Sequence, residues 1–386
     1  MPANFATPLP QSPRSDILEW RFPKPYHNLT LTGRSRAAWH TSFVIPQLNL
    51  LLDAGLVVNN LRPKHIFLTH GHSDHTLLTP AFVKRSDPPD IYCPAEMKDA
   101  LDNFINAKTM LNEGGGIWPP ESTSPYVQRY YTNKKGAEEP SSGLDAGDGA
   151  ARGDDPSQAD VIIEDDHSPI QEQQHEAGGK EDDDDDGNNG DNDGIHPLLR
   201  THRTHALRPG DTVTLRRLVA APQTWTATAF ACHHTVPCLG YVFSAVTPKL
   251  RPEFRGLSGP QLRALRQERG VDITAPVAVP VFAFLGDTTP SVLASGPGWL
   301  TGSGGGGRVR VVITECSFLW DEHRDQADRT RHTIWADLEP VVRRHLDTIF
   351  VLIHFSLRYS DEDIRAFFRE REVPENVVVW VDGSEE

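Results

Sequence analysis

The sequence predicts an α/β protein with a metal site at one edge of a β-sheet. Short apolar runs typical of buried strands alternate with stretches of helical periodicity, which is the pattern of α/β proteins. One apolar run, residues 66–68, leads directly into a segment that holds four potential metal ligands. Later apolar runs also end in a histidine, an aspartate or a glutamate, so ligand-type side chains recur at predicted strand ends.

Local patterns predict the first strands and the helix that follows them. Residues 28–55 hold two or three β-rich pieces separated by polar turns, which is typical of the first hairpins of a sheet. After the ligand-rich segment we expect a helix starting near Pro80 and a strand at 91–94. Residues 95–112 carry apolar side chains near helical spacing and predict a second helix.

Order is expected to stop at an acidic insert and to resume beyond it. Large apolar residues are scarce over 133–196, so we expect this segment to be a disordered insert. It would interrupt a single domain over 16–386, preceded by a flexible lead at 1–15. Its aspartates lack the spacing of a calcium-binding loop. Strands are expected at 212–218 and 223–232.

A short basic helix is predicted over 257–270. Ser258 and Pro260 are typical of a helix start, and Gly270 is typical of a helix end. Three arginines recur at intervals of three residues along it, at Arg263, Arg266 and Arg269. Such a row is most often a solvated face, and contact with a phosphate backbone is the alternative.

Charge is distributed unevenly along the chain. The 386 residues carry a formal net charge of −15. The segment 136–196 alone contributes −18, from 20 acidic and two basic residues, so the remainder carries +3. A mildly basic body is compatible with a phosphate-bearing substrate.

The sequence favours a cytoplasmic or nuclear protein that does not associate with a membrane. Its proline-rich first 20 residues lack the apolar stretch of a signal peptide, and no apolar span is long enough to cross a bilayer. The cysteines show no C-x-x-C pair, so we expect reduced, mostly buried thiols. They are Cys93, Cys232, Cys238 and Cys316.

The segment THGHSDH is typical of a metal site. Two histidines one residue apart, His70 and His72, can bind one ion, while Asp74 and His75 can bind a second ion nearby. Chance clustering among 17 histidines is the alternative. Four ligand-type side chains within six positions, directly after a strand, favour the metal.

Further ligand-type residues follow four other predicted strands. One strand is followed by two adjacent histidines, and spacing alone does not choose between them. Asp287, which follows another of these strands, can bridge two ions or simply form a turn. Because a metal site assembles at one edge of a sheet from successive loops, the whole set points to one site. Its members are His233 or His234, Asp287, Glu315 with the later His332, and His354.

These motifs together resemble a known family. THGHSDH, HTVPCLGY, LGDTT, ECSF followed by RHT, and IHFSLRY occur in an order that resembles the metallo-β-lactamase superfamily. Within it they resemble the ribonuclease Z family, which trims transfer RNA precursors at the 3′ end, and most of all its short, plant-type form. The likeness covers about residues 28–370 without the acidic insert. It implies an α/β fold, the four-layer αββα sandwich, and a homodimer.

The resemblance also implies a ligand set and a reaction. Two Zn²⁺ ions per chain are implied, with Mn²⁺ as the alternative metal, and precursor transfer RNA as the substrate. The metal-activated water would attack a phosphodiester, with Asp74 as its base. Glu315 and His332 would assist proton transfer to the leaving oxygen. One zinc would be held by His70, His72 and His234, the other by Asp74, His75 and His354, with Asp287 as the bridge.

Two other functions are compatible with parts of the sequence, which also departs from the family pattern at two places. A small-molecule metallo-hydrolase acting on a thioester or phosphodiester shares the histidine motif. A non-catalytic RNA-binding subunit would require lost ligands, and all seven are present. The family's Pro-x-Lys-x-Arg loop is replaced by GRSRAAWHTS, and only the short basic helix near 260–270 stands where many members have a long arm that grips transfer RNA.

Overall fold

The computed structural model describes most of the chain outside the acidic insert. The predicted lead at 1–15 and the predicted insert at 133–196 both lie outside the described residues. The described ranges are 17–112, 199–216, 218, 224–303 and 306–383.

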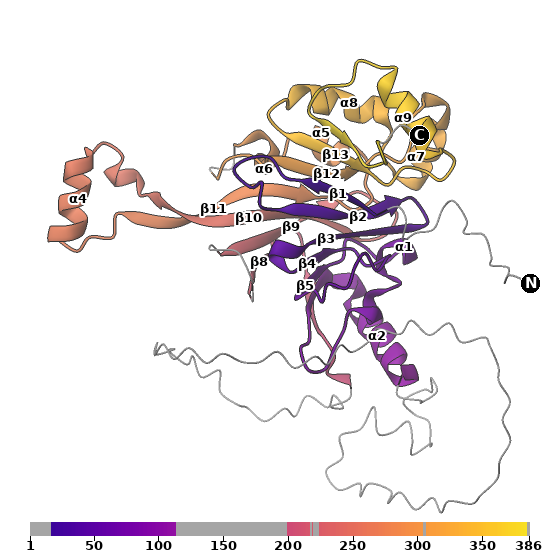
Figure 1. Cartoon of the computed structure of the whole chain (residues 1–386), viewed down its shortest axis with the longest axis horizontal. Helices are drawn as coiled ribbons and strands as arrows, with labels where there is room; N and C mark the ends of the chain where they lie inside the picture. Colours follow the sequence, from indigo (N-terminus) through magenta and orange to yellow (C-terminus); the bar gives the residue numbers. More distant parts are fainter. Residues whose placement is uncertain (1–16, 113–198, 217, 219–223, 304–305, 384–386) are drawn as a thin grey trace, which may run out of the picture.

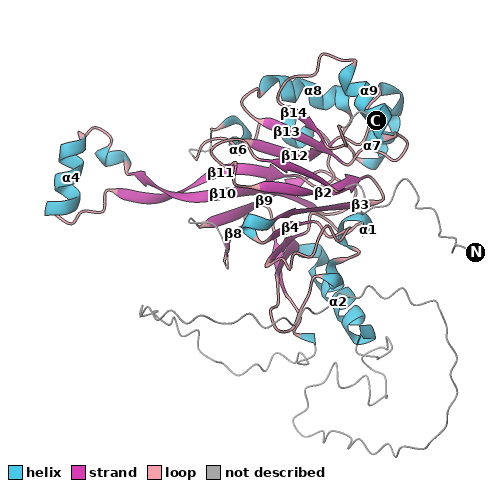
Figure 2. Ribbon diagram, viewed as in Figure 1, coloured by secondary structure: helices cyan, strands magenta, loops and turns pink. Residues whose placement is uncertain are grey.

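Two β-sheets packed face to face form the centre of the molecule, and helices cover their outer sides (Figure 1, Figure 2). Within the described residues each sheet has seven strands, and both sheets follow chain order. The first contains β1 (Leu18–Arg21), β2 (Thr30–Arg36), β3 (His40–Ile45), β4 (Leu50–Leu52), β5 (His65–Phe67), β6 (Asp90–Pro94) and β7 (Arg203–Leu207). The second contains β8 (Thr212–Leu215), β9 (Trp225–Cys232), β10 (Cys238–Leu250), β11 (Thr274–Phe284), β12 (Val311–Glu315), β13 (Ile349–Ile353) and β14 (Val377–Val379).

Each sheet changes from antiparallel to parallel pairing along its width. Strands β1 to β4 pair antiparallel, and β4 to β7 pair parallel. In the second sheet β8 to β11 pair antiparallel, and β11 to β14 pair parallel. Parallel neighbours end at the same edge of a sheet, so the loops that follow β5, β11, β12 and β13 can converge.

Three apolar cores hold four layers together. The largest lies between the sheets, with Phe43 and Phe67 on one side and Phe243 and Phe284 on the other. A second packs the outer face of the second sheet against helices, and a third packs the first sheet against α2 (Lys98–Asn112). The predicted four-layer αββα sandwich is therefore confirmed. The helices over the second sheet are α5 (Ser291–Ala294), α6 (Gly298–Thr301), α8 (Trp335–Arg344) and α9 (Asp361–Arg369), with α7 (Arg324–Thr330) nearby.

Most of the predicted elements before the insert are confirmed, and one is wrong. The β-rich stretch at 28–55 forms β2, β3 and β4, and residues 95–112 form a short 3-10 turn followed by α2. The helix expected near Pro80 is only a single 3-10 turn, Thr79–Ala81. Phe82 is buried beside α2, and the prolines at 88 and 89 prevent a helix from continuing towards β6.

A long arm projects from the second sheet, which corrects the expectation that the chain lacks one. The distal halves of β10 and β11 pair as a two-stranded ribbon, and α4 (Gly259–Glu268) lies at its tip (Figure 1). Ser258, predicted as the helix start, is the N-cap of α4 and forms a capping box with Gln261. The prolines along the ribbon conceal its strands in the sequence. Pro248 and Pro276 face each other in a two-stranded ribbon, where a missing N–H is tolerated.

The remaining predictions concern thiols and membrane spans. All four cysteines are free thiols, with Cys232 half-buried and the other three buried. None of the helices in the described part of the chain has the length and apolar character needed to cross a bilayer.

Candidate metal centre

Five loops bring ligand-type side chains to one place between the two sheets. The chain leaves β5 at a buried threonine and turns through His70 and His72 into the short helix α1 (Ser73–Thr76). The loop after β11 approaches this turn closely, because a Cβ on Gly286 would lie 2.4 Å from the Thr69 side chain. A glycine is needed there to let the two sheets present their ligands to a common centre.

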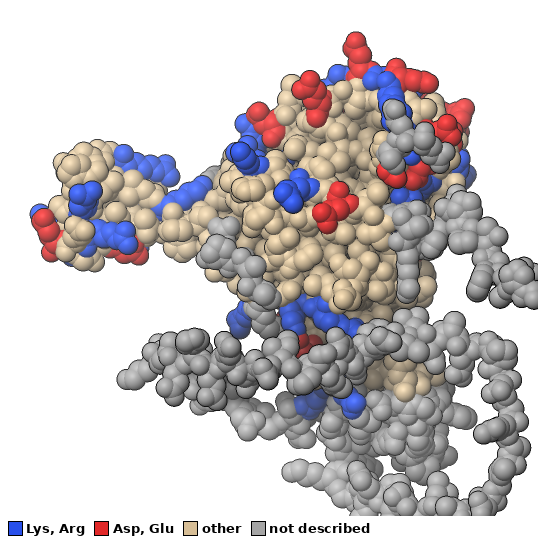
Figure 3. All heavy atoms as spheres, viewed as in Figure 1, with Lys and Arg blue, Asp and Glu red and all other residues tan. Residues whose placement is uncertain are grey.

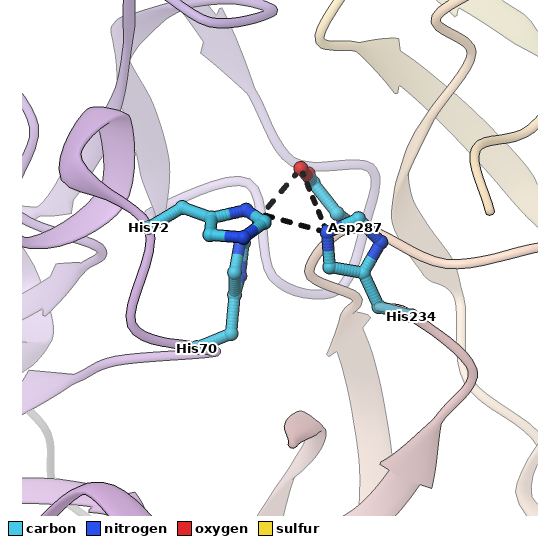
Figure 4. A group of neighbouring side chains, drawn as sticks. All are labelled: His70, His72, His234 and Asp287. Carbon is cyan, nitrogen blue, oxygen red and sulfur yellow. Dashed lines mark hydrogen bonds and ion pairs between the residues drawn. The ribbon is translucent and has the colours of Figure 1, made fainter. Parts of the chain in front are cut away.

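The first cluster contains three imidazoles and one carboxylate, which point toward one another (Figure 4). His72 Nδ1 and His234 Nε2 lie 3.3 Å apart. Asp287 Oδ2 lies 3.7 Å from His70 Nε2 and 3.9 Å from His234 Nε2. Of the two adjacent histidines, His234 is therefore the one that reaches the cluster, while His233 is exposed and contacts Thr289.

The second cluster shares the carboxylate of Asp287 with the first. Asp287 Oδ1 lies 3.4 Å from both His75 Nε2 and His354 Nε2. Asp74 Oδ2 lies 3.4 Å from His354 Nε2 and 3.6 Å from His75 Nε2. The two oxygens of one buried aspartate thus face two separate groups of ligand-type atoms.

The spacing of these atoms fits metal ions better than hydrogen bonds. Zinc at about 2.0–2.2 Å from four tetrahedral donors places those donors about 3.3–3.6 Å apart. The separations here are 3.3–3.9 Å, and the nitrogen pairs at 3.3–3.4 Å are long for hydrogen bonds. His70 Nε2 is buried and has no hydrogen-bond partner among the described residues, as expected of an atom that binds a metal. The donor set is therefore suited to metal ions.

Outer hydrogen bonds fix the orientation of the histidines. Asp53 Oδ2 accepts from His75 Nδ1 at 2.8 Å, and its other oxygen accepts from the backbone N–H of Thr69 at 2.8 Å. His70 Nδ1 contacts the Thr69 hydroxyl at 3.0 Å. Each of these contacts turns the Nε2 atom of the ring inward, where it can bind a metal.

The other two Nε2-facing histidines are held in the same way. His354 Nδ1 contacts the Ser317 hydroxyl at 3.1 Å. His234 Nδ1 lies 3.3 Å from the carbonyl oxygen of Arg331, whose guanidinium donates to the carbonyl of His234 at 2.7 Å. Sequence reasoning missed these supporting residues. For Asp53 a signal was available, since it follows the apolar strand β4 directly.

Buried Glu315 and half-buried His332 form a pair beside the shared aspartate. His332 Nδ1 donates to Glu315 Oε1 at 2.9 Å and lies 3.9 Å from Asp287 Oδ2. Glu315 is 1 % exposed and also accepts from the backbone N–H groups of Thr288 and Thr333. These bonds hold the carboxylate still, so that it in turn fixes the imidazole.

Charge in the site is set by burial and by these neighbours. Burial alone would lower the pKa of His332, but the Glu315 carboxylate outweighs this and raises it to about 9. Burial lowers the pKa of His70 well below its usual value, which favours a neutral ring able to bind a metal. Burial would raise the pKa of Asp287, but His354 and His75 hold it well below its usual value. Although burial opposes it, Asp287 and Asp53 likewise raise the pKa of His75 well above its usual value. The site therefore presents anionic and neutral donors together with two histidines, His75 and His332, that favour the protonated form when no metal is bound.

Comparison with known proteins agrees with this fold and site. The Metallo-beta-lactamase superfamily profile matches residues 47–213, a range that includes the THGHSDH turn. Over this range the chain is similar to the metallo-β-lactamase superfamily, as the motifs predicted.

The chain is also similar to ribonuclease Z proteins, which confirms the resemblance seen in the motifs. It is 30% identical over 185 residues to "tRNase Z TRZ2, chloroplastic" of Arabidopsis thaliana, covering 45% of this chain and 49% of that protein. It is 29% identical over 137 residues to "tRNase Z TRZ1" of the same plant, covering 35% and 47%. The chain thus spans about half the length of the curated relatives it matches.

A solved structure is also similar. The crystal structure of human tRNase Z, short form (ELAC1), aligns with a TM-score of 0.42 at 14% sequence identity. The alignment covers 91% of this chain and 95% of that one.

Proposed function

We propose that the protein is a zinc-dependent endoribonuclease that removes the 3′ trailer from transfer RNA precursors. The observation that carries the proposal is a seven-residue ligand set with the Glu315–His332 pair beside it, in a chain similar to proteins named tRNase Z. The ligand set supports a hydrolytic metal centre, and the similarity to proteins named tRNase Z supports transfer RNA precursors as the substrate.

The proposed centre holds two Zn²⁺ ions, one in each cluster. Asp287 would be shared between the two ions, because its two oxygens face different groups of nitrogens. When bound, two zinc ions supply Lewis acidity that activates water and offsets charge on a phosphate. The proposed ligands are His70, His72 and His234 for one ion and Asp74, His75 and His354 for the other.

Two protein groups would move protons during the reaction. Asp74 is oriented by the backbone N–H of Ala38, which donates to Asp74 Oδ2 at 3.0 Å, and its carboxylate can accept a proton from the attacking water. His332 carries a proton at neutral pH because its pKa is raised to about 9. It can donate that proton to the leaving ribose oxygen while Glu315 stabilises the imidazolium.

The arm is the proposed binding site for the RNA backbone. Figure 3 shows Lys and Arg side chains gathered on it. Between residues 250 and 273 it carries five arginines against three acidic residues, Glu253, Glu268 and Asp272. A ribbon with excess positive charge suits a phosphate backbone. The arginines are Arg251, Arg255, Arg263, Arg266 and Arg269.

Three broader features complete the proposal. The chain would be a homodimer in the cytoplasm or nucleus, and a single domain over 16–386. The segment 133–196 would be a spacer on its surface. Deletion of 136–196 should then leave cleavage of precursor transfer RNA nearly intact, and a large loss of activity would reject the spacer.

The test is cleavage of a precursor transfer RNA with zinc or manganese, beside His72→Ala. We expect the wild type to release the trailer and the variant to lose most activity, because His72 Nδ1 belongs to the first cluster. Equal cleavage by both proteins would contradict the metal mechanism. Turnover of a chromogenic phosphodiester or thioester without cleavage of precursor transfer RNA would instead favour a small-molecule hydrolase.

A further inference from the structure

A cavity lies where the arm joins the sandwich, away from the metal centre. Its volume is about 530 Å³. It opens beside the residues that precede β12 and β13, whereas the metal centre follows the other ends of these strands. We call it the arm-base pocket, and its walls include Pro25, Tyr26, Lys249, Pro280, Arg308 and Arg310.

The arm-base pocket has an excess of positive charge. Three cationic side chains line it with one carboxylate, that of Asp347. Arg308 Nη1 pairs with this carboxylate at 2.9 Å. Lys249 and Arg310 are exposed and form no ion pair with any described part of the chain. Two positive charges therefore remain for a ligand.

The framework of the pocket is fixed by the fold. The backbone of Arg310 is held between two strands, since its N–H donates to Val281 and its carbonyl accepts from Ile349. The ring of Tyr26 packs edge-on against buried Trp225, with 6.0 Å between ring centroids. The Arg310 guanidinium is close enough to Tyr26 to oppose the rise in its pKa that burial causes. Cations are thus held beside a half-buried aromatic ring.

This combination suits single-stranded nucleic acid. Proteins that bind single strands pair cations that follow the backbone with aromatic rings on which bases stack. An inorganic anion would use the cations but not the ring or the prolines. The pocket is also continuous with the arm, because Lys249 lies on β10 two residues before Arg251.

We propose that the arm-base pocket binds the single-stranded 3′ trailer of the RNA substrate, an inference that rests on the proposed function. Glu315 lies five positions after Arg310 along β12, a span of about 17 Å. The pocket would therefore hold RNA remote from the scissile phosphate. It would strengthen substrate binding without entering the chemical step, and only for trailers long enough to reach it.

The test compares two precursors that differ only in trailer length. One trailer is too short to reach the pocket, and the other has on the order of 16 nucleotides. For Lys249→Glu/Arg310→Glu we expect KM on the long-trailer precursor to rise about ten-fold and to depend less steeply on salt. The kcat on both precursors and the KM on the short one should stay at wild-type values. The control is Lys108→Glu on α2, an exposed lysine that bonds Asn112, and it should behave as wild type.

Two results would overturn the inference: an unchanged KM on the long-trailer precursor, and an equal rise in KM on both precursors. If thermal melting shows that the charge-reversed variant has lost its folded state, Lys249→Gln/Arg310→Gln, which adds no negative charge, takes its place. The inference is then overturned if this variant fails to raise KM on the long-trailer precursor alone. If the wild type cleaves neither precursor, the proposed function fails. The pocket is then judged by fluorescence anisotropy with a labelled trailer oligonucleotide, which should bind the charge-reversed variant about ten-fold more weakly.

Discussion

Glu315→Gln isolates the proton-transfer step from metal binding. Glutamine keeps the shape of the side chain but removes its charge and turns one acceptor oxygen into a donor. The pKa of His332, about 9 next to the carboxylate, should fall to about 6.5, because the group that raises it most is gone and burial, which lowers it, then opposes Asp287 alone. At pH 7.5 the protonated fraction of His332 would drop from about 97% to about 9%. We therefore expect kcat at pH 7.5 to fall at least about ten-fold.

The assay is kcat on precursor transfer RNA across pH, with metal content measured on the same samples. A protonated donor works only below its pKa, so the alkaline fall in rate should move from about pH 9 to about pH 6.5. Bound metal should stay the same, because Glu315 is not a proposed ligand. Glu339→Gln on α8, which removes a carboxylate paired with Arg343, is the control. An unchanged pH profile, or loss of metal together with activity, would refute the assigned role.

Three further predictions concern the support of the site. Gly55→Ala should lower stability by about 1–3 kcal/mol and weaken metal binding, because its Cβ would lie 1.9 Å from the Asp74 carbonyl oxygen. Urea unfolding and metal titration measure both effects. Gly71→Ala, with no atom within 4 Å of its Cβ, is the control and should leave stability and metal binding close to wild type. Arg36→Met should lower the free energy of unfolding by about 3 kcal/mol, because Arg36 donates to Asp361 at 2.6 Å and to the carbonyl of Ser356. A change below about 1 kcal/mol in urea unfolding would show that these bonds contribute little to stability. Burial, aided by Arg34, lowers the pKa of His40 to about 4. The unfolded chain therefore takes up this proton first, and the metal-free protein should lose stability as pH falls from about 6.5 to 4. His40→Gln should flatten that part of the curve, and an identical slope would exclude His40 as its source.

The strand ends that carry metal ligands can be predicted from the sequence, because each depends only on an apolar run and the residues directly after it. An apolar run fixes a buried strand, and parallel strands deliver the residues after them to one edge. His70, Asp287 and His354 follow this rule, and the structure brings them together. The choice of His234 over His233 needed the family resemblance, since both follow the same strand.

Features that depend on distant pairing are not visible in the sequence. The arm forms only because residues 244–250 pair with 274–280, and the prolines in both segments mask the strand pattern. Asp53 supports His75 across 22 positions, and Arg36 meets Asp361 across 325. The helix expected near Pro80 failed for a local reason, because the periodicity of a few residues there was outweighed by the prolines before β6.

The most direct test of the central claim is a zinc titration of chelated protein, with cleavage of precursor transfer RNA measured at each step. The paired clusters joined by Asp287 predict that activity returns as zinc approaches two ions per chain, and that Asp287→Asn does not recover. Full cleavage by the metal-free protein, or full recovery of Asp287→Asn, would contradict a binuclear metal centre as the source of the activity.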